Sequence, residues 1–108
     1  MPKIRIITIP PGQAPLEVRK EWVGAVMPLL PRQDIVGIET GVLGGEPDPQ
    51  NVDGYRVDTD EAICSLVERN TPDAKRAADW WIDWKENTRN GRMCCALVFS
   101  KDVCALVQ

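Results

Sequence analysis

The sequence predicts an α+β fold in which a small antiparallel sheet packs against two or three helices. Apolar and β-branched segments suited to strands lie at both ends of the chain, and segments with helical periodicity lie mainly in the middle. Strands at the ends with helices between them are typical of an α+β fold with an antiparallel sheet. The length of 108 residues fits a single domain spanning residues 1–108.

The composition indicates a globular protein. Hydrophobic residues make up 44% and charged residues 27% of the chain, which is enough to bury a core without disulfide or metal staples. The net charge of −3 argues against nucleic acid as a partner, because such interfaces are basic. No window approaches the roughly 18 consecutive apolar residues of a membrane span. The N-terminal segment lacks the long apolar region of a secretory signal, so we expect a cytoplasmic protein without membrane partners.

Strand and helix signals alternate in the first third of the chain. Residues 3–10, "KIRIITIP", are β-branched and predict the first strand. Residues 14–24 predict a short helix, because Pro15 suits the first helical position. The apolar run at 25–31 predicts a strand, and Pro28 within it indicates an edge or a bulge.

Two helices are predicted in the middle of the chain. Asp58 followed by Glu61 has the spacing of a capping box, which begins a helix over 58–70. Thr71 before a proline begins a second helix, which runs to about residue 87. Further strands are predicted at 35–43, 54–57, 93–99 and 103–107. Loops or turns are predicted at 44–54, 88–91 and 100–102.

Three segments resemble an SH3-like barrel: "KIRIITIP", "WVGAVMPL" and "ALVFSKDVCALV". In that fold a long loop follows the first strand, and a short helical turn joins the last two strands. The resemblance covers the two ends of the chain and implies a barrel as the alternative to an open sheet. The helical pair in the middle would then be an insertion. No residue matches the aromatic ligand groove of SH3 domains, so no site is carried over.

Several catalytic chemistries are excluded or disfavoured by composition. The chain has no histidine, which excludes His-based general bases and histidine metal sites. The glycine-rich segment 41–46 lacks the spacing of a phosphate-binding loop, and the acidic segment 46–61 reads as a solvated loop rather than a cation site. We therefore expect no catalytic residue, no metal and no cofactor, and a non-enzymatic role is favoured.

The cysteines lack any C-x-x-C pair, which argues against zinc-ribbon and thioredoxin-like sites. We expect them to be free thiols buried as small hydrophobic side chains. They are Cys64, Cys94, Cys95 and Cys104.

The segment "DWWIDW", residues 79–84, holds three of the four tryptophans. On a helical wheel Trp81 lies near the middle of an apolar arc, with Trp84 and then Trp80 progressively nearer its edge. The arc spans roughly 200°, about twice the minimum stripe for a helix that rests on one surface. Trp81 is therefore expected in the core.

Two functional hypotheses follow from this helix. In the first, Trp80, Trp84 and Arg76 border a surface that binds a protein or a second copy, as in a homodimer, because tryptophan and arginine are enriched among interface hot spots. In the second, the protein is a small-molecule-binding protein or enzyme whose pocket uses Trp22 or Trp80 and carboxylates such as Asp83. Burial of all three rings in the core is the competing structural interpretation.

Overall fold

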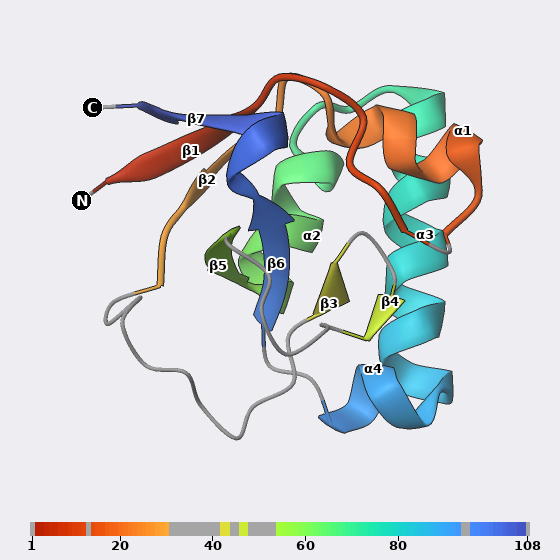
Figure 1. Ribbon diagram of the computed structural model, residues 1–108. Helices are drawn as coiled ribbons and strands as arrows, with labels where there is room; N and C mark the ends of the chain where they lie inside the picture. The colour runs from red at the N-terminus through yellow and green to blue at the C-terminus, as the bar shows by residue number, and fades with distance from the viewer. Residues whose placement is uncertain are drawn as a thin grey trace.

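A computed structural model describes residues 2–12, 14–30, 42–43, 46–47, 54–93 and 96–107 (Figure 1). Its architecture is α+β, as the sequence predicts. The strands are β1 (Lys3–Ile6), β2 (Val26–Pro28), β3 (Val42–Leu43), β4 (Glu46–Pro47), β5 (Gly54–Asp58), β6 (Ala96–Ser100) and β7 (Cys104–Val107). The α-helices are α1 (Leu16–Arg19), α2 (Thr59–Val67), α3 (Pro72–Asn87) and α4 (Arg89–Met93), and the 3₁₀-helices are η1 (Lys20–Trp22) and η2 (Lys101–Val103).

The first sheet joins the two ends of the described chain. It has three strands in the order β2-β1-β7, and both pairings are antiparallel. In register, Ile4 of β1 lies between Met27 of β2 and Leu106 of β7. Because paired residues point to the same face, the buried Ile4 and Met27 mark the inner face of this sheet.

The second sheet contains the other four strands, in the order β4-β3-β6-β5. The β5–β6 pairing is antiparallel, as expected for this fold class, whereas β3 pairs with β6 in parallel. The described strands thus form two open sheets, and a closed barrel is not among their pairings. One feature implied by the barrel resemblance is present, because the short helical turn η2 joins β6 to β7.

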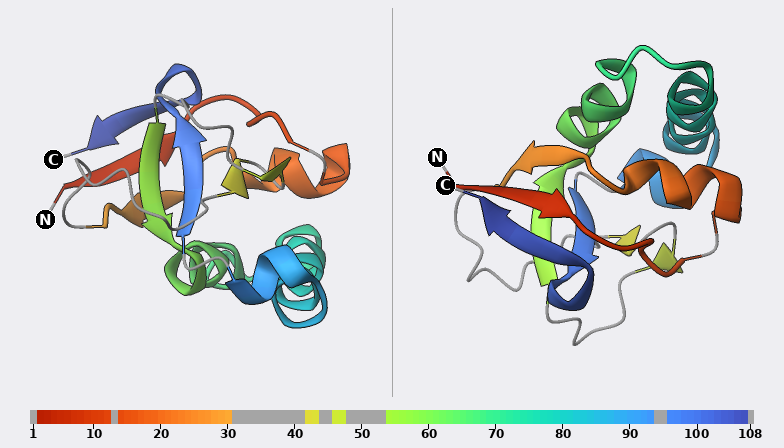
Figure 2. Two further views of the ribbon diagram at one scale, coloured as in Figure 1. Left: turned by 60° about the horizontal axis from the view of Figure 1, so that its bottom comes forward. Right: turned by 90° about the horizontal axis from the view of Figure 1, so that it is seen from above.

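The two central helices begin where local capping predicts. The Asp58 carboxylate accepts a hydrogen bond from the Glu61 amide at 3.1 Å, and the Thr71 hydroxyl accepts one from the Ala74 amide at 3.2 Å. Figure 2 shows α2 and α3 side by side on one side of the sheets. The strand predicted at 25–31 is shorter than expected, and most of the strand predicted at 35–43 lies outside the described residues.

The turn predicted at 88–91 is wrong, because helix α4 begins at Arg89. Thr88 explains the difference: its hydroxyl donates to the Trp84 carbonyl at 2.6 Å and accepts from the Gly91 amide at 2.9 Å. One side chain therefore closes α3 and caps the start of α4. The sequence predicts a turn here because it contains an Asn-Gly pair, and nothing in that pattern indicates the Thr88 cap.

The hydrophobic core connects both sheets to the helices. Its largest fully buried side chains include Trp22, Trp81 and Phe99, which come from η1, α3 and β6. A single cluster of buried residues contains side chains from the first sheet, the second sheet, η1, α2 and α3. Segments far apart in the sequence are therefore held by the same core.

Candidate functional site

The tryptophans of "DWWIDW" belong to a cluster of aromatic rings centred on Trp81. The Trp81 ring lies 5.6 Å from Trp22, 4.9 Å from Trp80 and 5.2 Å from Trp84, measured between ring centroids. Trp22 in turn meets Phe99 edge-on at 5.3 Å. Tilted and edge-to-face contacts at these distances are favourable for aromatic pairs, so the cluster is a specific packing unit.

Burial falls from the centre of the cluster to its edge. Trp81 and Trp22 are fully buried, Trp84 is 8% exposed, and Trp80 is half-buried against the core. This order confirms the prediction from the helical wheel. Trp84 consequently offers little ring surface to a partner, and Trp80 is the one member of this cluster that retains a partly exposed ring.

Charged side chains flank Trp80 on α3. Arg76 lies one turn before it and Asp83 nearly one turn after it, so all three residues share one side of the helix. Both charged residues are exposed, and we call these three residues the Trp80 surface. The Asp83 carboxylate accepts a hydrogen bond from the side-chain Nδ2 of Asn87 at 2.8 Å.

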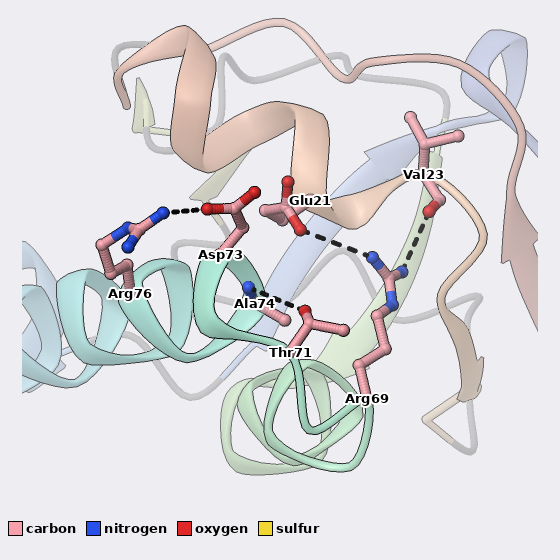
Figure 3. A network of polar contacts seen from close by, with 7 residues as sticks. All are labelled: Glu21, Val23, Arg69, Thr71, Asp73, Ala74 and Arg76. Atoms are coloured by element: carbon pink, nitrogen blue, oxygen red, sulfur yellow. Dashed lines mark hydrogen bonds and ion pairs between the residues drawn. The ribbon is translucent and has the colours of Figure 1, made fainter.

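Arg76 forms its ion pair with Asp73 on the same helix, as Figure 3 shows. The side chains of this pair are 73% and 55% exposed, so solvent screens the pair and its contribution to stability is small. Among the described aromatic residues, the cation–π contact is that of Lys101 over Tyr55, at 5.4 Å, and not one of Arg76 over Trp80. The Arg76 side chain is thus exposed and directed toward Asp73 rather than stacked on the Trp80 ring.

Arg69 fixes the element that carries Trp22. Its guanidinium donates to the Val23 carbonyl at 2.9 Å and lies 3.9 Å from the Glu21 carboxylate (Figure 3). These contacts tie the chain just after α2 to η1 and the turn that follows it. They help to hold Trp22 where it meets Trp81.

The residues of the alternative pocket are not brought together around a described cavity. Trp22 is fully buried against Trp81 and Phe99, whereas Asp83 is exposed on α3. A cleft of about 240 Å³ lies elsewhere, between the first sheet and α2. Its volume is below the roughly 300–1,000 Å³ of typical ligand pockets. The cleft is lined by Lys3, Val26, Pro28, Glu61, Cys64, Ser65 and Glu68.

This cleft is a feature that sequence reasoning missed. Glu61, Cys64, Ser65 and Glu68 recur at helical spacing, which places them on one face of α2, but nothing in that spacing indicates that a strand lies opposite. Its lining combines one cation and two carboxylates with little apolar surface. The cleft is therefore an open polar groove rather than an enclosed ligand site.

The prediction of buried thiols is wrong for Cys64, which is exposed on α2 because it faces away from the core. Cys104 is half-buried; its Sγ contacts the Ser100 carbonyl at 3.2 Å, and burial raises the pKa of this thiol. Cys94 and Cys95 lie outside the described residues. Within the described ranges, no group of three or more metal-binding side chains is placed to hold an ion.

Comparison with known proteins gave no relative. No family model matches the chain, and neither the curated proteins nor the solved structures contain a match. In the described part of the chain, no helix combines the length and apolar character needed to cross a bilayer.

Proposed function

We propose that this protein is a non-enzymatic protein-interaction module, and that the Trp80 surface binds its partner protein. The observation that carries the proposal is the partly exposed Trp80 ring at the edge of an otherwise buried aromatic cluster, between an exposed cation and an exposed anion. Tryptophan and arginine are the residue types that most often dominate interface energetics.

The setting of the ring supports this role. Trp80 is braced edge-to-face by Trp81, with an interplanar angle of 79°. A ring that is already ordered loses little side-chain freedom on binding, so more of its contact energy contributes to affinity. Arg76 and Asp83 have opposite charge on either side of the ring, and such a pattern favours one orientation of a complementary partner.

The alternative function, a small-molecule-binding protein or enzyme using Trp22 and Asp83, has less support. A pocket that uses Trp22 would have to open the contact between Trp22 and Trp81. Binding of a small molecule would then quench or shift tryptophan emission without any protein partner present. That readout separates the two functions.

The test compares the wild type with Trp80→Ala, Arg76→Glu and the matched control Ile82→Ala. Ile82 is 37% exposed on the opposite side of α3 from Trp80, and Arg76 does not belong to the buried cluster. Each variant is first checked for native circular dichroism. Proteins captured from the source cells by each immobilised variant are then compared, and the captured protein is purified and titrated.

We expect a partner that wild type and Ile82→Ala bind equally. Trp80→Ala should weaken it by about 30-fold or more, which corresponds to a hot spot of about 2 kcal/mol, and Arg76→Glu should weaken it as well. A partner lost equally from Ile82→Ala, or no partner that distinguishes folded Trp80→Ala from wild type, would refute the proposal.

A further inference from the structure

Among the described strands β7 has a partner on one side only, and its own residues do not discourage strand pairing on the other. β7 is the last strand of its sheet among the described strands, and its four residues, "CALV", include no charge, proline or glycine. Leu106 is 57% exposed, the highest value among the exposed large hydrophobic side chains. Open apolar edges are places where another strand adds, and proteins commonly block them with charge, proline or a covering element.

Hydrogen bonds within the sheet show which backbone groups face this edge. The Ile7 amide donates to Val103, toward β7, whereas the Ile6 amide donates to Ala25, toward β2. The backbone N–H and C=O groups of successive residues point alternately to the two neighbouring strands. Arg5 therefore faces β7, as Ile7 does, and forms a hydrogen-bonded pair with Ala105. The intervening residues of β7, Cys104 and Leu106, must therefore direct their N–H and C=O groups away from β1, toward the open edge.

The opposite edge of the same sheet, formed by β2, is protected against the addition of a strand. By the same alternation, the backbone of Pro28 in β2 is directed away from β1, toward the outer edge. Proline has no N–H to offer a further strand there. Helix α2 also lies beside β2, across the polar cleft. Within the described part of the chain, the β7 edge is therefore the one edge of this sheet that is ready to accept a strand.

The inner face of the sheet shows what kind of strand would fit. Met27, Ile4 and Leu106 form one row across the three strands, and the first two are fully buried whereas Leu106 is not. Ile6 and Cys104 form the neighbouring row. Both apolar rows end abruptly at β7, and an added strand with apolar side chains at alternate positions would extend them.

We propose that β7 pairs with β7 of a second copy, antiparallel and centred on Ala105. This register alone lets both edge-facing residues of each copy pair, because Cys104 of one copy lies opposite Leu106 of the other. The apolar row then runs through Met27, Ile4 and Leu106 into Cys104 and Ile6 of the second copy. The two Ala105 side chains meet on the outer face. They form a non-hydrogen-bonded pair, the kind of pair in which the Cα atoms of antiparallel strands lie closest together.

Charge does not oppose this arrangement. The nearest cation on the outer face, Arg5, lies one strand away from the contact. Across the two-fold axis the two Arg5 residues are separated by three strand spacings, about 14 Å, which exceeds the screening length of about 8–10 Å. The contact is small, so we expect a weak, concentration-dependent dimer rather than a permanent one.

Sedimentation equilibrium of the full chain over a wide range of concentration tests the pairing. The variant is Leu106→Lys, and the matched control is Leu16→Lys, which makes the same change at a side chain of nearly equal exposure, 56%, on α1. We expect wild type and Leu16→Lys to dimerise with the same Kd, and Leu106→Lys to raise it by about tenfold or more. A monomeric wild type, or equal effects of the two lysines, would overturn the inference.

Covalent trapping provides a second measurement that does not depend on affinity. In the proposed register the two Cα atoms at position 105 lie about 4.5 Å apart, within disulfide range. Mild oxidation should therefore link Ala105→Cys into dimers, whereas wild type, whose exposed Cys64 is the internal control, should stay unlinked. Equal cross-linking of the two proteins would count against the pairing.

This inference uses residues distinct from the Trp80 surface. If Trp80→Ala abolishes the dimer and Leu106→Lys does not, the β7 pairing is refuted while the proposed function stands. The reverse result supports the β7 pairing and leaves the Trp80 surface to a different protein.

Discussion

Gly91 determines how closely α4 approaches the end of α3. A Cβ atom at this position would lie 2.6 Å from the Cα of Lys85 and still closer to the carbonyl oxygen of Trp84. Both neighbours are backbone atoms, so neither can move aside as a flexible side chain would. The glycine is required by this close approach.

We therefore expect Gly91→Ala to lower the free energy of unfolding by about 1–3 kcal/mol, the usual cost of overpacking. Urea unfolding followed by circular dichroism measures this cost. Asn87→Ala is the control, because it removes only a surface hydrogen bond and should change stability by less than about 0.5 kcal/mol. Equal stability of Gly91→Ala and wild type would show that α4 does not rest on α3.

The order of burial among the tryptophans was predictable from the sequence, because helical geometry alone fixes it. Trp81 is central and Trp80 peripheral on any straight helix with this sequence. The partners were not predictable in this way. That Trp22 and Phe99 complete the cluster depends on contacts between residues far apart in the chain.

At the scale of elements, Thr88 connects the end of α3 to the start of α4 through its hydrogen bonds. Its amide donates to the Trp84 carbonyl at 3.1 Å, its hydroxyl donates to the same oxygen, and that hydroxyl accepts from Gly91. The hydroxyl satisfies backbone groups at the end of one helix and the start of the next. Both helices therefore depend on the same oxygen atom.

Thr88→Val keeps the shape of the side chain and removes this hydroxyl. We expect a loss of about 0.5–2 kcal/mol in unfolding free energy, as for other helix caps, and faster hydrogen exchange at the Gly91 amide. Thr88→Ser retains the oxygen and should stay close to wild type. Exchange at Gly91 that does not differ between valine and serine would contradict this role.

Helix starts were predicted well because capping is local: Asp58 and Thr71 bond to amides only three residues ahead. Sheet order was not predicted. The parallel pairing of β3 with β6 joins residues near 42 to residues near 97, and no local pattern encodes that choice. The cleft beside α2 was missed for the same reason, since its two walls are distant in sequence.

At the scale of the whole molecule, Trp81 lies at the centre of the aromatic cluster that connects η1 with α3. It contacts Trp22 from the N-terminal region and two further tryptophans on α3, and Trp22 connects to Phe99 of β6. It is fully buried, so truncation would leave a large cavity at the centre of this network.

We expect Trp81→Ala to cost about 3–5 kcal/mol, a large share of the roughly 5–15 kcal/mol that stabilises a typical domain. Trp80→Ala should cost clearly less, because its ring is already partly solvated. Denaturant unfolding of both variants measures the difference. A larger cost for Trp80 than for Trp81 would contradict the described centre of the cluster.

The pairing of β1 with β7 also constrains the order in which the chain can fold. Lys3 lies opposite Val107, so β1 leaves the ribosome long before its partner β7 has been synthesised. Contacts of such high sequence separation form late, because a long loop must close before they contribute. Until then Ile4 and Ile6 belong to a nascent chain whose first sheet lacks one of its three strands, and that sheet is completed only after β7 has been translated.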